Sequence, residues 1–268
     1  MQCRHCQTEV TNNFCPTCGH PKAIKRLDWH YIVHDLFHVL HLETGIFSTV
    51  WKLLTAPGRT LREFISEDRT KIVKPVLFLV LTSLVYTLMM KVTHVEDQYI
   101  KISNDGKVMI PEYIGLIFEW VRSNYGYSNL LMSIFIALWL RLFFRKFSYN
   151  LVEWMVILCY TMGMGMLFYF LFGILSLLFS TVLLNSGSIL AVLYTSFAIG
   201  KVYNKPGFMP YFKAFWAYVL GFITFAIVLA VVGVSLDIRA GNFEKFKNQK
   251  IDESSTKKVE ATTGLNPH

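Results

Sequence analysis

The sequence predicts an all-α polytopic membrane protein with about five transmembrane helices, a small N-terminal zinc ribbon and a short extracytoplasmic hairpin. Three observations predict this fold class. Of the 268 residues, 53% are hydrophobic and only 16% are charged, whereas soluble domains carry about 25% charged residues. The apolar residues gather in long runs, and four of the five cysteines lie within the first 18 residues. This composition excludes a soluble enzyme, a disordered tail and a fibrous protein.

The cysteines near the N-terminus form the pattern Cys3-x2-Cys6-x8-Cys15-x2-Cys18. Each C-x-x-C pair can place two thiolates on one cation, and two pairs supply the tetrahedral set of four sulfurs that structural Zn2+ prefers. A redox dithiol pair would need a βαβ context, and secreted disulfides would need an export signal, which residues 1–26 lack. We therefore expect residues 1–21 to be a structural zinc ribbon in a reducing cytosol.

Residues 22–71 are predicted to be a cytosolic helical segment that is amphipathic and basic. Four histidines in it share one helical arc beside an apolar stripe: His30, His34, His38 and His41. Histidines at i and i+4 can chelate a metal from one helix face, so a second metal site is one interpretation. The other interpretation places histidines at the edge of an interfacial helix, and it is favoured because no carboxylate completes the row.

A basic stretch ends this segment, with six Lys and Arg against three acids between residues 52 and 74. It lies directly before the first long apolar run, where a chain meets the phosphate headgroups of the membrane. Nucleic-acid binding is the rival interpretation, but the stretch contains no recognisable reader fold. We therefore expect membrane lipid, and no nucleic acid, as the partner of this stretch.

Several short motifs in this part of the chain carry a resemblance. They are Thr44-Gly45, Pro57-Gly58, Arg62-Glu63-Phe64-Ile65 and Lys74-Pro75. With the cysteine pairs before them, they resemble the bacterial membrane-protein family called domain of unknown function 3667. The later part of the chain resembles, more distantly, the five-span Yip-type membrane proteins. The resemblance implies a fold and a location in the bacterial inner membrane, but no established activity. One departure is Glu67-Asp68, which stands where a Gly-Lys pair is expected.

Five apolar stretches qualify as membrane spans, because about 20 apolar residues cross a hydrocarbon core of about 30 Å. Together they form a membrane domain over residues 72–236. The predicted spans cover about residues 72–90, 128–145, 151–180, 188–204 and 211–236. The third apolar stretch continues to residue 183, which is too long for one simple span. It must tilt, break or protrude, and its candidate break points are Gly163, Gly165 and Gly173.

The distribution of basic residues predicts the orientation. Lys and Arg cluster before the first span, after the second span and after the fourth span, whereas residues 184–187 carry no charge. With five spans, the three basic clusters share the cytoplasmic side. Splitting the third stretch would move the basic residues 201–213 outside. We therefore expect a cytoplasmic N-terminus, an extracytoplasmic C-terminus and a polar, disordered tail over residues 237–268.

The loop after the first predicted span has a pattern of its own. Residues 99–103 alternate between polar and apolar, Asn104-Asp105-Gly106 is typical of a turn, and residues 108–110 return. This pattern predicts an extracytoplasmic β-hairpin. A short apolar helix over residues 111–121 is expected to follow it and to lie in the membrane interface.

Two ionisable residues lie in or near the predicted spans. Glu153 is the only acid in an apolar stretch, and Arg141 lies near the end of the second span. Intramembrane ionisable groups suggest function, so a proton or substrate pathway is one interpretation. A Glu153–Arg141 pair, or a glutamate at the interface, is the structural interpretation and the favoured one.

These features support three functional hypotheses. The first is a non-enzymatic membrane adaptor or organiser whose zinc ribbon recruits a cytosolic protein partner. The second is a small transporter or channel-like protein that uses Glu153 and Arg141. The third is a membrane metallo-enzyme that uses the row of four histidines. The sequence contains no Ser-His-Asp set, HExxH motif, Gly-rich phosphate loop or paired intramembrane carboxylates, so we expect no enzyme.

Overall fold

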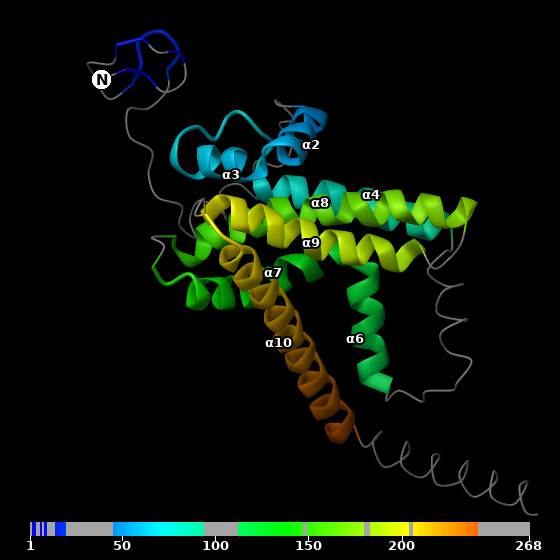
Figure 1. Ribbon diagram of the computed structural model, residues 1–268. Helices are drawn as coiled ribbons and strands as arrows, with labels where there is room; N and C mark the ends of the chain where they lie inside the picture. The colour runs from blue at the N-terminus through cyan, green and yellow to red at the C-terminus, as the bar shows by residue number, and fades with distance from the viewer. Residues whose placement is uncertain are drawn as a thin grey trace, which may run out of the picture. The chain divides into compact units, whose positions relative to one another are not determined.

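The computed structural model describes residues 2–3, 6, 8–9, 14–19, 45–93, 112–146, 149–179, 183–203 and 206–240. These residues contain eight α-helices and no strand (Figure 1), which confirms the all-α fold class. The chain divides into two compact units. The first comprises Met1–Val95 with Tyr125–Phe222, and the second comprises Glu96–Asn124 with Ile223–His268.

The first unit contains most of the helices. They are α2 (Ile46–Thr55), α3 (Pro57–Ser66), α4 (Pro75–Thr93), α7 (Tyr125–Phe143), α8 (Leu151–Leu178) and α9 (Leu183–Tyr203). The second unit contains α6 (Glu112–Ser123), and α10 (Met209–Arg239) begins in the first unit and ends in the second.

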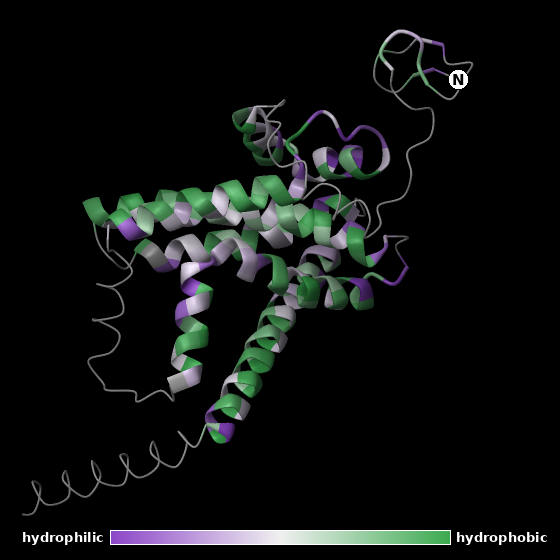
Figure 2. Ribbon diagram, turned by 180° about the vertical axis from the view of Figure 1, so that it is seen from behind, coloured by the Kyte–Doolittle hydropathy of each residue, from purple (hydrophilic) through white to green (hydrophobic). Residues whose placement is uncertain are grey.

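Four of these helices, α4, α7, α8 and α10, are long and apolar enough to cross a membrane. Figure 2 shows hydrophobic residues along most of their length. Each of the five predicted spans falls on one of the long helices, and the largest difference in bounds is at α9, which begins at Leu183 instead of residue 188. Helix α9 has 21 residues but is not among the four, and polar side chains such as Asn185 and Ser188 occupy its first two turns.

Helix α8 is the centre of the first unit. It is one continuous helix of 28 residues, or about 42 Å at 1.5 Å per residue, and all its residues from 152 to 166 are buried. It passes through all three candidate break points, and the helix ends only at Leu178. Two of the glycines admit neighbouring helices instead. A Cβ at Gly163 would lie 2.7 Å from the Phe78 ring, and one at Gly165 would lie 3.2 Å from the Ala191 Cβ.

In the second unit, Asp237 joins the end of α10 to the start of α6. Its carboxylate is fully buried and accepts hydrogen bonds from the backbone N–H groups of Tyr113 at 3.1 Å and Ile114 at 3.4 Å. A carboxylate is stabilised there because the first N–H groups of a helix have no partners within it. Gly233 permits the close approach, since a Cβ there would lie 2.8 Å from Ile114 Cγ1.

The bounds of α6 and α10 can be compared with two segments that the sequence predicts. Helix α6 lies where the short apolar helix over residues 111–121 is expected. Helix α10 continues to Arg239, so residues 237–239 of the predicted tail are helical. The predicted hairpin over residues 99–110 and the rest of the tail lie outside the described residues.

Candidate functional site

The four cysteines of the predicted zinc ribbon lie together. One sulfur from each of Cys3, Cys6, Cys15 and Cys18 lies within 4.8 Å of all the others. The Cys3 and Cys18 sulfurs are 3.6 Å apart, and the Cys6 and Cys15 sulfurs are 3.5 Å apart. Four sulfurs bound tetrahedrally to zinc at 2.3 Å would be separated by about 3.8 Å. The cluster therefore has nearly the size that one tetrahedral metal ion requires.

Backbone hydrogen bonds shape the two halves of this cluster. In the first half, the Cys3 N–H donates to the Thr8 carbonyl at 2.8 Å, and Gln2 pairs with Glu9 in an isolated antiparallel bridge. In the second half, the Gly19 N–H donates to the Cys15 carbonyl at 2.9 Å. Gly19 has a φ of 70°. Glycine adopts this backbone conformation easily because glycine has no Cβ.

The chemistry of the cluster also fits a metal. The side chain and backbone of Thr8 lower the pKa of the Cys6 thiol from 9.0 to about 6, with smaller contributions in the same direction from the neighbouring cysteines. The thiolate that forms is the metal-ligating species. All five cysteines are free thiols, and the separations of 3.5 and 3.6 Å are far longer than a disulfide bond of about 2.05 Å.

A second feature is the contact between α3 and the end of α9. Pro57 occupies the first turn of α3, where its fixed φ suits a helix start. Gly58 faces α9 so closely that a Cβ would lie 2.5 Å from the carbonyl carbon of Lys201. One turn further on, Arg62 donates to the carbonyl of Lys201 and, at 3.3 Å, to that of Val202. Carbonyls in the last turn of a helix have no partners within it, so Arg62 caps α9.

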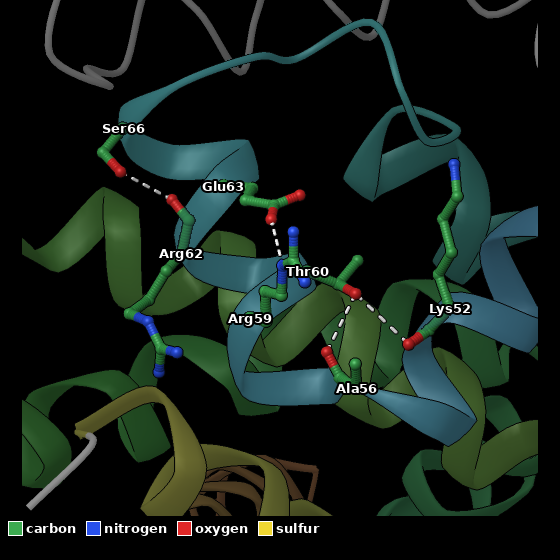
Figure 3. A network of polar contacts seen from close by, with 7 residues as sticks. All are labelled: Lys52, Ala56, Arg59, Thr60, Arg62, Glu63 and Ser66. Atoms are coloured by element: carbon green, nitrogen blue, oxygen red, sulfur yellow. Dashed lines mark hydrogen bonds and ion pairs between the residues drawn. The ribbon is translucent and has the colours of Figure 1, made fainter. Parts of the chain in front are cut away.

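Polar contacts link α3 to α2, and a further ion pair lies on the surface of α3 itself. The Thr60 hydroxyl donates to the carbonyls of Ala56 at 2.9 Å and of Lys52 at 3.2 Å. Arg59 Nε lies 2.6 Å from the Glu63 carboxylate, one turn away. Figure 3 shows the Arg62 guanidinium directed away from this network, towards a neighbouring helix. Arg62 is therefore available to cap α9 while the other polar groups hold α3 to α2.

Three hydroxyl groups hold α2 and the start of α4 against the bundle. The Thr49 hydroxyl accepts from the Val73 N–H at 3.0 Å, and the Tyr160 hydroxyl of α8 donates to the Val73 carbonyl at 2.7 Å. The Tyr194 hydroxyl of α9 donates to the Leu53 carbonyl at 2.8 Å. Helices α8 and α9 thus satisfy backbone groups in α2 and just before α4.

The segment that makes these contacts is also the part of the chain that resembles known proteins. Residues 43–87 match the family described as "Protein of unknown function (DUF3667)". This match covers 45 of the 268 residues and supports the resemblance to that family. No curated protein and no solved structure matches the chain, and the more distant resemblance to Yip-type proteins stays a prediction. In the DUF3667 segment, residues 43–87, the motifs Pro57-Gly58 and Arg62-Glu63 have a structural role in the contact with α9.

Glu153, the predicted intramembrane acid, lies in the first turn of α8. Its carboxylate accepts from the Asn150 N–H at 2.6 Å, and the Asn150 side chain accepts from the Glu153 N–H at 2.8 Å. This reciprocal pair is a capping box, which satisfies two N–H groups at a helix start. Arg141 is exposed in the last turn of α7. Both residues therefore lie at helix ends.

The start of α8 lies close to Arg62 of the DUF3667 segment. Burial raises the pKa of Tyr149, the Arg62 guanidinium opposes this shift, and the Glu153 carboxylate adds to it. The Phe144 ring contacts both Trp154 in the first turn of α8 and Tyr203 at the end of α9, so these two helix ends lie close together. The remaining predicted site residues, His30, His34, His38 and His41, lie outside the described residues.

Sequence reasoning gave Arg62 a role only within the basic stretch expected to meet lipid headgroups, and it assigned no role to Asp237. A signal for Arg62 exists, because Gly58 and Arg62 are four residues apart and share one helical face. A glycine on a helical face permits close contact with another helix. An arginine on the same face can then reach the carbonyl groups at the end of that helix. The signal for Asp237 is its position as the only acid at the end of a long apolar stretch.

We predict that the purified chain binds one zinc ion and that Cys15→Ser greatly reduces this binding, because the cluster then loses one of its four thiolates. Elemental analysis of the detergent-solubilised protein measures the ratio of zinc to chain. Cys159→Ser is the matched control, since Cys159 is buried in α8 and should leave the ratio unchanged. Zinc that survives Cys15→Ser but is lost with Cys159→Ser would contradict the assignment.

Proposed function

We propose that this protein is a non-enzymatic adaptor or organiser of the bacterial inner membrane, with a cytosolic zinc ribbon that binds a protein partner. The cluster of four cysteines is the observation that supports this proposal most. A zinc ion held by four protein thiolates has no open position for substrate or water. Such a metal stabilises a small folded surface, because metal binding supplies most of the folding free energy of so short a ribbon.

The transporter hypothesis gains little support from its proposed residues. The Glu153 carboxylate accepts a hydrogen bond from Asn150 at the start of α8, and Arg141 is exposed at the end of α7. A helix cap and an exposed arginine near the membrane boundary are ordinary structural positions. The metallo-enzyme hypothesis depends on four histidines outside the described residues. We favour the adaptor because of the cysteine cluster.

We further propose that the protein crosses the membrane five times, with α9 as the fourth span. Arg62 caps the end of α9, and the Phe144 ring contacts both Tyr203 at the end of α9 and Trp154 in the first turn of α8. The end of α9 and the start of α8 are therefore on the same side. Helix α9 must then return across the distance that α8 covers, which requires two crossings between residues 151 and 203.

The second unit supports the same topology. Asp237 near the end of α10 binds the start of α6, and α6 lies in the chain between α4 and α7. Because residues 94–111 contain no apolar run long enough to span a membrane, we propose from the order of the chain alone that α6 and the end of α10 are on the side to which α4 delivers the chain. With the basic residues before α4 in the cytoplasm, this side is extracytoplasmic. Five crossings satisfy this condition, whereas four would return α10 to the cytoplasm.

We predict that reporter fusions will alternate between the two sides along the chain. Fusions after residues 25, 148 and 207 should give cytoplasmic fluorescence of green fluorescent protein. Fusions after residues 105, 186 and 268 should give extracytoplasmic alkaline phosphatase activity. The fusion after residue 268 decides between five and four crossings, and a cytoplasmic location there would contradict the five-span topology.

We predict that a photo-crosslinking amino acid at Phe14 will trap a discrete cytosolic protein in intact cells. Phe14 is a suitable position because its side chain is 63% exposed next to the cysteine cluster. The adduct should disappear when Cys15→Ser is added, because the ribbon then loses its metal and its fold. The same amino acid at Phe179, exposed just after α8, is the control. Absence of an adduct at Phe14, or the same adduct at Phe179, would contradict the adaptor function.

A further inference from the structure

Helix α2 has one buried face and one exposed apolar face. Thr49 and Leu53 are completely buried against the rest of the first unit. On the other face, Phe47 is 91% exposed, Trp51 is 68% exposed and Leu54 is 45% exposed. The spacing of four and three residues places these three side chains on one helical surface. Nothing among the described residues covers this surface, which we call the outer face of α2.

The hydrogen bonds of α2 indicate its depth along the bundle. The Leu53 carbonyl accepts from Tyr194 of α9, whereas Gly58 and Arg62 of α3 contact Lys201 near the end of the same helix. Tyr194 and Lys201 are seven residues apart, which corresponds to about 10 Å along a helix. The tyrosine side chain is directed towards the start of its helix, which adds to this distance. Helix α2 therefore contacts α9 at a point well before the last residue of α9, whereas α3 contacts the last turn of α9.

Helix α8 gives the same result independently. Tyr160 donates to the Val73 carbonyl, and the Val73 N–H donates to Thr49 of α2. Tyr160 is seven residues beyond Glu153, whose carboxylate caps the start of α8. The Cα separation is about 10 Å along the helix axis, and the depth of the contact is smaller by the reach of the Tyr160 side chain towards the start of α8. Both α8 and α9 thus contact α2 inward from their polar ends. If the two helices span the membrane, this depth is where hydrocarbon surrounds them.

We propose that α2 is embedded in the cytoplasmic leaflet of the membrane, with its outer face against the lipid. Phe47 and Leu54 contact acyl chains, and Trp51 lies near the headgroups, where amphipathic aromatic rings are enriched. The backbone of α2 tolerates this position because most of its N–H and C=O groups are bonded within the helix, while its first N–H groups have no side-chain cap. The Leu53 carbonyl near its end is bonded by Tyr194.

The charges around α2 complement an anionic lipid surface. Six basic and three acidic residues lie between residues 52 and 74. The acidic charges are partly offset, since Glu63 pairs with Arg59 and Asp68 is buried and accepts two hydrogen bonds from Thr70. The Lys52 ammonium group of α2 donates to the Lys71 carbonyl at 2.9 Å, so the other basic residues of the stretch are the ones that can meet the phosphates.

This inference changes the predicted cytosolic segment over residues 22–71. Helix α2 becomes part of the membrane domain, while α3 lies at the boundary with its Arg59–Glu63 pair in water. The inference rests on the proposed membrane location of the bundle and does not require the adaptor role. Its test therefore has to separate a wrong depth for α2 from a wrong location for the whole protein.

The test introduces the photo-crosslinking amino acid p-benzoylphenylalanine at position 47 or 51 of the full chain. Each protein is irradiated in bacterial membranes and in vesicles of phosphatidylethanolamine and phosphatidylglycerol, and adducts are identified by mass spectrometry. Position 138 is the positive control, because Leu138 is 50% exposed on the spanning helix α7. Position 59 is the matched negative control, because the Arg59 side chain is 79% exposed on α3.

We expect phospholipid adducts at positions 47, 51 and 138 and none at position 59. Lipid adducts at 138 without any at 47 and 51 would overturn the inference and leave the membrane location intact. An adduct with a second copy of the chain, or with another protein, at positions 47 and 51 would also overturn it and identify the true occupant. Absence of lipid adducts at all four positions would contradict the membrane location itself. The adaptor role is tested separately at Phe14.

Discussion

The contact of Gly58 with the backbone of Lys201 is the constraint on which the rest of the first compact unit depends. Only a residue without a Cβ lets α3 approach α9 so closely, and this approach brings Arg62 to the carbonyls that end α9. Helix α2 is joined to α3 by Ala56 alone, so its place beside α8 and α9 follows from this contact. Val73, bonded to Thr49 and Tyr160, then determines where α4 begins.

The ionisable groups of the described helices act mainly at helix ends. Arg62 caps α9, Glu153 takes part in the cap of α8, and Asp237 binds the start of α6. In a membrane this arrangement is physically favourable, because unsatisfied N–H and C=O groups at helix ends are costly where water is excluded. Glu153, which the sequence suggests for a transport pathway, therefore stabilises the start of α8. The cysteine cluster remains the feature with the clearest chemical specialisation.

The sequence predicts the features that depend on local pattern. Apolar runs of sufficient length predict the long helices, and the spacing of the cysteines predicts a cluster that the structure brings within 4.8 Å. Features that depend on contacts distant in sequence were not predictable in the same way. The contact between Gly58 and Lys201 joins residues more than 140 positions apart. The pair of Asn150 and Glu153 is local, and its Asn-x-x-Glu pattern is a capping-box signal that the sequence reasoning missed. Glycines in α8 suggest breaks, but Gly163 and Gly165 lie where neighbouring helices pack closely against this continuous helix.

The most direct test of this account is the thermal stability of Gly58→Ala in detergent. The added methyl group would lie 2.5 Å from the Lys201 backbone, which cannot move aside as a flexible side chain does, so a loss of about 1–3 kcal/mol is expected. Gly115→Ala is the matched control, since a Cβ on this α6 glycine has no neighbour within 4 Å and should be neutral or stabilising. A clear fall in melting temperature for Gly58→Ala alone is the predicted result. Equal or higher stability of Gly58→Ala would contradict the central role of the α3–α9 contact.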